Sequence, residues 1–220
     1  MKKIIIAITA FLFFSKSLVF ADINASVGVS GNMGVYAATG TEKNYGAGAV
    51  VKTTKEYGAF SDTYGSIFAE IGNEVISLGV DYVPMKIETP QNISNDGVNP
   101  NRVSADFEDL TTIYAKLNIP QLGGTYLKVG YSKVDVIVNE SMNSGSTYKD
   151  TDTSGMTYGI GYDHRLEVGG MSIRAEISYS DFDDVKADNG RSSTASPGLN
   201  EIVISDMIGA RGTISIVKNF

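Results

Sequence analysis

The chain has 220 residues, with 18 basic against 25 acidic side chains and no cysteine. This acidic balance argues against a nucleic-acid partner, because phosphate recognition requires a basic face. The lack of cysteine excludes a disulfide framework, a thiolate metal site and a thiol nucleophile. Stability must therefore come from strand pairing and burial.

Residues 1–21 are predicted to be a secretory signal. Lys2 and Lys3 precede an apolar run over residues 4–14, and Ala21 supplies a small residue for cleavage before Asp22. A membrane anchor is the alternative, but the run is much shorter than the roughly 20 residues that a spanning helix needs. Removal of this segment takes away three lysines and no acids, which leaves 15 basic against 25 acidic residues and a balance of −10.

The mature part, residues 22–220, opens on an alternating pattern. Over residues 23–37, apolar residues such as Val27 and Val29 share one face, and polar residues such as Ser30 and Asn32 share the other. This period of two predicts a β-strand.

The same pattern returns in seven further segments. They lie near residues 59–72, 76–82, 112–119, 127–132, 156–163, 171–180 and 202–220. Three short turns near residues 72–74, 120–124 and 167–170 alternate with four long connectors, over residues 39–57, 86–109, 138–153 and 181–200. We expect these long connectors to be mobile loops.

Two local irregularities give further predictions. Pro90 and Pro100 are expected to keep the second connector out of any strand ladder. The fifth strand loses its alternation at Val134 and Val136, which predicts a bulge or an exit from the membrane.

Eight strands with this rhythm predict an all-β protein, an eight-stranded antiparallel up-and-down transmembrane β-barrel in which the last strand closes on the first. The short turns and both chain ends then lie on one side, which in an outer membrane is the periplasmic side, and the long loops face outward. A lipocalin-like soluble barrel or a secreted sandwich is the alternative, because alternation alone does not say which face points inward.

The polar face favours the membrane barrel. It mixes small residues with charges of both signs, as suits an eight-stranded lumen that side chains just fill. An unpaired charge in that lumen would cost several kcal/mol, so we expect the charges to form one ion-pair network. The predicted members are Glu70, Lys116, Lys128, Arg174, Glu176 and Arg211.

The apolar face is nearly free of charge at mid-strand, as a lipid-facing surface must be. Lys218 and Asp206 are the exceptions; we expect Lys218 to lie at the inner interface and Asp206 to lie above the hydrocarbon. Aromatic residues gather near strand ends, as in an interfacial girdle; they include Tyr82, Tyr131, Tyr162, Tyr179 and Phe220.

With this pattern the chain resembles the small outer-membrane β-barrel proteins, the group that includes the OmpA transmembrane domain, OmpX and the opacity-type proteins. Its final segment, residues 212–220, looks like the C-terminal signal that the insertion machinery of that group reads, with Phe220 as the last residue. Lys218 departs from the usual apolar or aromatic residue at its position. The resemblance implies a Gram-negative outer membrane, contact with lipid and lipopolysaccharide, and assembly by the barrel-assembly machinery.

The resemblance leaves activity open, because members of this group differ chiefly in their loops. We expect a structural or surface-interaction role, adhesion included, with extracellular loop ligands. A narrow porin-like channel is the alternative, and a lipid-modifying enzyme is a third hypothesis.

Catalytic and metal-binding patterns are weak in this sequence. The single histidine, His164, lies beside a short turn, and no Gly-x-Ser-x-Gly elbow is present. The acidic segment over residues 181–190 lacks the spacing of an EF-hand, so we expect a solvated loop, with divalent bridging to lipopolysaccharide as a hypothesis. We therefore predict no enzyme activity, no cofactor and no metal site.

Overall fold

A computed structural model describes residues 23–94, 101–141, 147–195 and 198–220. Eight long strands form one antiparallel sheet in which each strand pairs with its neighbour in the chain order, and β11 pairs back on β1. The sheet is therefore a closed barrel, as predicted. The long strands are β1 (Asn24–Gly46), β2 (Ala49–Gly72), β3 (Ile76–Tyr82), β6 (Asn101–Asn118), β7 (Thr125–Ser141), β8 (Thr151–Arg165), β9 (Met171–Phe182) and β11 (Asn200–Asn219).

Three short strands lie at the loop end of the barrel. β4 (Ile87–Glu88) and β5 (Asn92–Ser94) pair with β6, and β10 (Val185–Asp188) pairs with β11. A single turn of 3₁₀-helix, η2 (Pro120–Leu122), connects β6 to β7. Within the described residues, no helix has the length and apolar character needed to cross a membrane.

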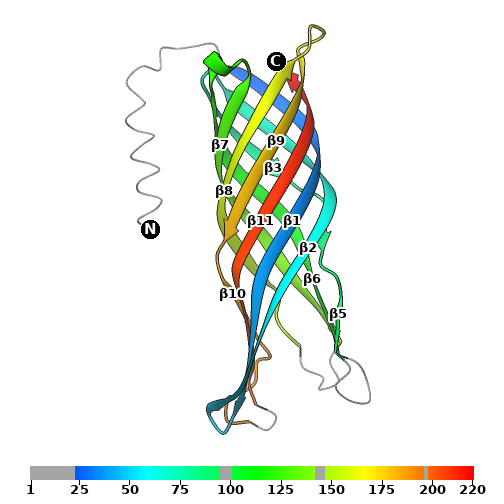
Figure 1. Cartoon of the computed structure of the whole chain (residues 1–220), viewed down its shortest axis with the longest axis vertical. Coiled ribbons are helices and arrows are strands. Elements are labelled where there is room, and N and C mark those ends of the chain that lie inside the picture. Colours follow the sequence, from blue (N-terminus) through cyan, green and yellow to red (C-terminus); the bar gives the residue numbers. More distant parts are fainter. Residues whose placement is uncertain (1–22, 95–100, 142–146, 196–197) are drawn as a thin grey trace, which may run out of the picture.

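Figure 1 shows that the strands are strongly tilted and that the short turns lie at the same end of the barrel as the C-terminus. The first strand also begins at this end, since Phe220 donates its backbone N–H to the carbonyl of Ala25 at 2.9 Å. The long connectors lie at the opposite end. This arrangement matches the predicted separation of the short turns and chain ends from the long connectors. That the turn end is the periplasmic one stays a prediction.

The first connector is not the polar loop expected over residues 39–57. β1 and β2 continue as a paired hairpin up to the pair Gly46 and Ala49, so most of the connector is strand. Ala47 and Gly48 form the turn with φ angles of 51° and 83°, as a tight hairpin turn requires. Backbone pairing extends the strands because nothing in residues 39–57 removes a ladder donor.

The second connector also contains strand, contrary to expectation. β4 and β5 flank Pro90 and pair with β6 on either side of it, so the proline interrupts the ladder for only a few residues. Pro100 lies outside the described residues. β5 and β4 pair on one edge only, which is the position where a strand tolerates a nearby proline.

The bulge predicted at Val134 and Val136 is wrong, whereas the alternative, an exit from the membrane at this height, stays a prediction. Both valines keep the inward phase of β7 and are 4% and 2% exposed. The bulge lies instead in the partner strand β6, between Glu108 and Thr111. The alternation of polar and apolar residues breaks here because the barrel interior itself changes from polar to apolar at this height.

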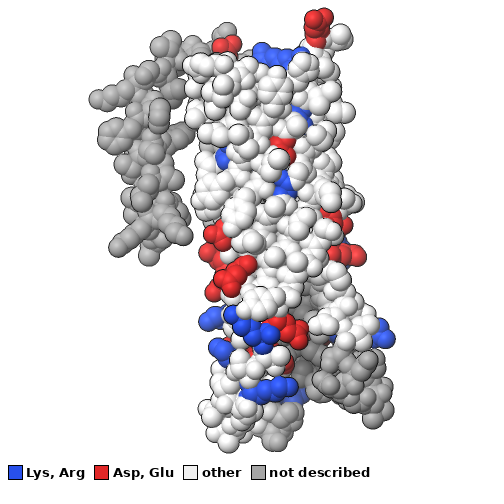
Figure 2. All heavy atoms as spheres, viewed as in Figure 1, with Lys and Arg blue, Asp and Glu red and all other residues white. Residues whose placement is uncertain are grey.

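The outward face of the barrel is apolar over its membrane-spanning part. Ile113, Ile177 and Ile214 are 66%, 68% and 60% exposed although they lie at mid-strand. Figure 2 shows this region as mostly white, with charged side chains gathered towards the loop end. Such an exterior requires hydrocarbon around it. The exposed tyrosines Tyr131 and Tyr179 lie where this apolar belt ends.

Candidate functional site

The half of the lumen nearest the turn end is filled by ion pairs. Glu70 of β2 is the centre of the largest group: its carboxylate accepts from Lys116 Nζ at 2.6 Å and from both terminal nitrogens of Arg174 at 2.6 and 3.0 Å. Arg174 also binds Asp163 at 3.0 Å. Glu70, Lys116 and Arg174 are all about 5% exposed.

Two further ion pairs lie in the same lumen. Lys128 of β7 binds Glu176 of β9, and Arg211 of β11 binds Asp81 of β3 at 3.3 Å. The structure thus places all six predicted lumen residues inside the barrel and gives each of them an opposite charge.

The expectation of a single ion-pair network is wrong in its connectivity. Among the described residues, the lumen charges form three separate groups, centred on Glu70, Glu176 and Asp81. The reason is geometric, because most of these ion pairs join strands that face each other across the lumen, and charges there meet only where the two strands present them at the same height. Asp81 and Asp163 complete these groups, and their inward phase in the sequence could have identified them.

Two tyrosines connect the group centred on Glu70 to the group centred on Glu176. Tyr114 donates to Glu70 at 2.8 Å while its ring lies 4.9 Å from Lys128 Nζ. Tyr126 donates to Glu176 at 2.8 Å while its ring lies 5.4 Å from Lys116 Nζ. Each tyrosine therefore combines a hydrogen bond to one group with a cation–π contact to the other.

Glycines on adjacent strands provide the space for both rings. A Cβ added at Gly79 would lie 2.5 Å from the ring of Tyr114, and one at Gly161 would lie 2.3 Å from the ring of Tyr126. Neither distance is possible for real carbon atoms. The glycine content of the strands is in part a consequence of this crowding.

A layer of hydroxyl groups lies above the ion pairs. Thr112, Ser132, Thr157 and Ser180 come from four consecutive barrel strands, and their side-chain oxygens form a chain with separations of 2.7, 2.7 and 2.8 Å. On the other side of the lumen, the hydroxyls of Tyr36 and Tyr64 lie 2.6 Å apart. The layer satisfies its own hydrogen bonds and leaves almost no free space.

Beyond the hydroxyl layer, towards the loop end, the interior becomes apolar. A buried cluster of Tyr64, Val83, Ile87, Leu110 and Val134 forms its base. The rings of Tyr36, Phe60 and Phe107 stack in series, with centroid separations of 5.2 and 5.9 Å. The expectation of a polar lumen therefore holds only for the half nearest the turn end.

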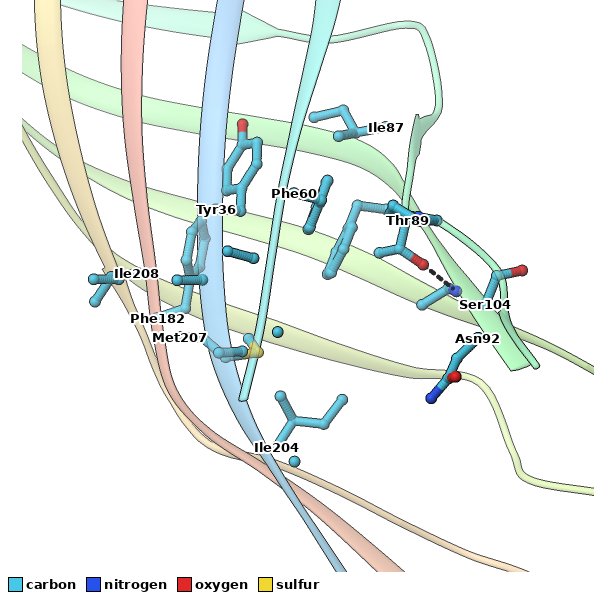
Figure 3. Close-up of a pocket in the computed structure, with 18 of the residues that line it drawn as sticks. Tyr36, Phe60, Ile87, Thr89, Asn92, Ser104, Phe182, Ile204, Met207 and Ile208 are labelled. Carbon is cyan, nitrogen blue, oxygen red and sulfur yellow. Dashed lines mark hydrogen bonds between the residues drawn. The ribbon is translucent and has the colours of Figure 1, made fainter. Parts of the chain in front are cut away.

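This apolar region encloses a pocket of about 500 Å³. Figure 3 shows side chains from distant parts of the chain converging on it, including Phe60, Phe182, Ile204 and Met207. Thr89 lies at its edge and accepts a hydrogen bond from the backbone of Ala105 at 2.8 Å. Among its described lining residues, Glu56 is the only charged one.

The wall beside the pocket lacks continuous strand pairing. Two contacts bridge its lower part, because the backbone N–H of Gly65 donates to Met85 Sδ at 3.3 Å and that of Glu88 donates to Asp62 Oδ2 at 3.2 Å. β2 pairs with β3 only from Ile67 to Gly72, whereas on its other edge it pairs with β1 along its whole length. Over residues 49–66, no described strand pairs with the free edge of β2, because β4 and β5 pair with β6 instead. The pocket is lined on one side of this gap by residues 56–60 and on the other by residues 87 and 89–92.

The sequence pattern contains little indication of this pocket. Many of its lining residues, such as Phe60, Phe107 and Phe182, lie at strand ends or within segments predicted to be loops. One signal is present, since inward positions change from Ser132 to Val134 and Val136 along one strand. In the sequence alone, that change looks like a break in the alternation of polar and apolar residues.

The remaining predicted residues lie away from this site. His164 is exposed on the outer face, where its ring stacks on Tyr162 at 6.5 Å, and no described serine or carboxylate binds it.

Lys218 donates to the carbonyl of Gly169 and lies over the Phe220 ring at 5.6 Å, so its charge is held at the rim. Phe220 itself is exposed, and its role in insertion remains a prediction. The signal at residues 1–21 lies outside the described residues.

The acidic segment over residues 181–190 is partly strand. β10 pairs with β11 through it, and Asp188 accepts from the backbone of Gly190 at 2.8 Å. The described residues contain no group of three or more histidine, cysteine or acidic side chains arranged to hold a metal ion.

Comparison with known proteins gives a fold and no sequence family. No family model matches the chain, and no curated protein matches it. Among solved structures, the outer membrane protein OprG from Pseudomonas aeruginosa has a TM-score of 0.62 at 13% identity, over 89% of this chain and 95% of that one. The chain has the fold of a small outer-membrane β-barrel protein.

Two other barrels overlap less well. The outer membrane protease OmpT from Escherichia coli has a TM-score of 0.47 at 12% identity, over 89% of this chain and 97% of that one. Ail of Yersinia pestis has a TM-score of 0.40 at 12% identity, over 88% and 99%. Neither likeness bears on the activity of this outer-membrane barrel.

Proposed function

We propose that this protein binds a small apolar molecule in the pocket at the loop end of its barrel. We further propose that the molecule exchanges with the membrane through the gap beside β2. The single observation that carries the proposal is the 500 Å³ apolar pocket, which lies directly at the interruption between β2 and the β4–β5 segment.

The position of the gap supports lateral exchange. Strand pairing ends at Ile67 and Tyr82, and the backbone N–H of Glu88 still reaches Asp62 across the gap, so the unbridged part lies beside residues 56–60, nearer the loop end. A molecule leaving the pocket there would enter the outer interface of the bilayer without crossing the polar lumen. Apolar pockets with few polar groups are typical sites for small ligands.

The filled lumen argues against the channel alternative. A solute moving along the axis would have to separate the Tyr36–Tyr64 hydrogen bond and then the ion pairs around Glu70 and Glu176. Breaking a buried ion pair costs about 3–5 kcal/mol.

We also propose that the protein is not an enzyme. A surface-interaction role, with lipopolysaccharide or other extracellular ligands at the loops, remains compatible with pocket binding.

Photolabelling tests the proposal. The full chain, purified from the outer membrane in detergent, is irradiated with a neutral 4-phenylbutanol analogue that carries a diazirine, and labelled peptides are located by mass spectrometry. We expect labelling at pocket residues such as Phe60, Phe107 or Met207, and protection of these positions by unlabelled 4-phenylbutanol. Labelling confined to the outer apolar belt would contradict the proposal.

A matched pair of variants separates the pocket from the lipid-facing surface. Ala105 lines the pocket, whereas Ala175 is exposed on the outer face. Ala105→Trp should abolish pocket labelling because the indole fills the cavity, and Ala175→Trp should leave it unchanged. The different gel mobility of unboiled and boiled samples shows that each variant is a folded barrel.

A further inference from the structure

Two glutamates face the interior of the loop end, above the apolar pocket. Gly40 and Ile204 are directly paired and both line the pocket, and Glu42 lies two residues further along the same regular stretch of β1. Glu140 is directly paired with Val103, which also lines the pocket. Because directly opposed residues share a face of the sheet, both carboxylates lie on the inner side of the wall.

Tyr148 is hydrogen-bonded to one of these glutamates and lies near the other. It is 7% exposed, its backbone N–H donates to Glu140 Oε1 at 2.6 Å, and its hydroxyl has no hydrogen-bond partner among the described residues. Burial, together with the charges of Glu42 and Glu140, raises the pKa of the Tyr148 hydroxyl to about 12. The hydroxyl therefore lies within the field of both carboxylates.

Unsatisfied acceptors accumulate at the same place. Asn200 donates to Glu42 at 2.6 Å, while its own carbonyl oxygen, Oδ1, is buried and has no donor within the part of the chain that the structure describes. The same holds for Glu140 Oε2. Buried polar atoms without partners are rare in proteins, and three of them occur here.

No cation in the described residues compensates these carboxylates. No described lysine or arginine forms an ion pair with Glu42 or Glu140, and Lys43, next in the chain to Glu42, binds Glu201 at 3.5 Å. Two partly buried carboxylates without a counter-charge repel each other and are poorly solvated.

We propose that this cluster, formed by Glu42, Glu140, Tyr148 and Asn200, binds the ammonium group of a ligand whose apolar body occupies the pocket below. An ammonium group carries three donors and no acceptor, which suits the three unpartnered oxygens. The Tyr148 ring adds an aromatic surface of the kind that attracts cations.

This inference rests on the proposed function and specifies its ligand class as an apolar primary amine. A bare divalent cation is the competing occupant. It prefers six to eight oxygen ligands, mainly carboxylates, and this cluster has two carboxylates and a neutral phenol. The continuity of the cluster with an apolar pocket also favours an organic cation, because a metal ion alone makes no use of that pocket.

Competition against the neutral photolabel tests the inference. The competitors are 4-phenylbutylamine, 4-phenylbutanol and 4-phenylbutyrate, which share one apolar body and differ in the charge of the head group. The concentration that halves pocket labelling is measured for each. We expect the amine to compete about tenfold better than the alcohol, as charge-assisted hydrogen bonds imply, and the carboxylate to compete worst.

Variants locate the preference. Glu42→Gln combined with Glu140→Gln should bring the amine to the level of the alcohol while leaving competition by the alcohol unchanged. Glu201→Gln, which removes a carboxylate paired with Lys43, should keep the full preference. Because all variants are compared in the same micelles, partition of the competitors into detergent cancels.

The outcomes are distinguishable. If no competitor protects the pocket, the proposed function itself fails. If the alcohol protects but the amine is no better, or if the double variant keeps the preference for the amine, the ammonium site is refuted and the apolar pocket stands. Calcium binding to the unmodified protein that is lost in the double variant and displaces the amine would assign the cluster to a metal ion instead.

Discussion

The hydroxyl groups of Tyr36 and Tyr64 lie 2.6 Å apart and mark the boundary between two different interiors of one barrel. On one side, Arg211 and Asp81 begin the charged lumen. On the other side, Leu110 and Val134 begin the apolar pocket. A barrel of eight strands is narrow enough for two side chains to make such a boundary.

This boundary predicts the absence of a stable conducting state. In a planar lipid bilayer, the unmodified protein should give no reproducible open level, because the hydroxyl layer and the ion pairs leave no continuous aqueous path. Tyr36→Phe removes one hydroxyl but keeps the ring, and it should remain closed. A reproducible single-channel step with the unmodified protein would contradict the filled lumen.

The central position of Glu70 predicts an order of stability effects. Glu70→Leu leaves the buried Lys116 without its carboxylate and should lower the free energy of unfolding by about 3–5 kcal/mol. Lys116→Met should cost less, because Glu70 keeps both hydrogen bonds from Arg174. Urea unfolding in lipid vesicles measures both values. Equal costs would show that Arg174 does not hold Glu70.

The apolar exterior predicts a strong penalty for charge at mid-strand. Ile177 is 68% exposed and lies on the outward face of β9. Ile177→Arg should lower the free energy of unfolding in vesicles by about 2–4 kcal/mol, because the guanidinium would enter hydrocarbon. Val168→Arg, in the exposed turn after β8, is the control and should have little effect. A negligible cost at Ile177 would mean that this face is in water.

Position 161 should not tolerate even the methyl group of alanine in place of Gly161. A Cβ at this position would lie 2.3 Å from the Tyr126 ring, so Gly161→Ala must displace the tyrosine from Glu176 and should cost about 1–3 kcal/mol. A Cβ added at Gly212 would meet nothing within 4 Å, so Gly212→Ala provides the matched control. The same urea unfolding experiment compares the two. Similar costs would point to backbone preference and not to ring displacement.

Tyr148 should titrate far above an ordinary tyrosine. Its pKa of about 12 in the folded state, against 10.0 unfolded, means that folding favours the protonated hydroxyl. The resulting stabilisation is fully present below pH 10 and is lost as pH rises towards 12. NMR of ring-labelled tyrosine, assigned with Tyr148→Phe, reports the pKa. Glu42→Gln combined with Glu140→Gln should move it towards 10, and an unchanged value would show that burial alone raises it.

Alternation along the chain, together with the nearly charge-free apolar face, is sufficient to predict the closed barrel and the separation of its short turns from its long connectors. Residues such as Val29 and Ser30 must face opposite sides of a strand, and only a closed sheet satisfies every backbone group in a bilayer. The same rule places Glu70, Lys116 and Arg174 in the lumen. It does not show which charges pair, since pairing depends on the relative heights of strands far apart in the sequence.

The pocket cannot be predicted from the sequence, for a related physical reason. Phe60, Phe107 and Phe182 are separated by 47 and 75 residues in the chain, and they meet only because β2, β6 and β9 reach the same height in the barrel. The gap beside β2 likewise arises from a choice of partners, as β4 and β5 pair with β6. A periodic pattern specifies which face of a strand is apolar, and only the closed tertiary structure decides which strand ends meet and what space they leave.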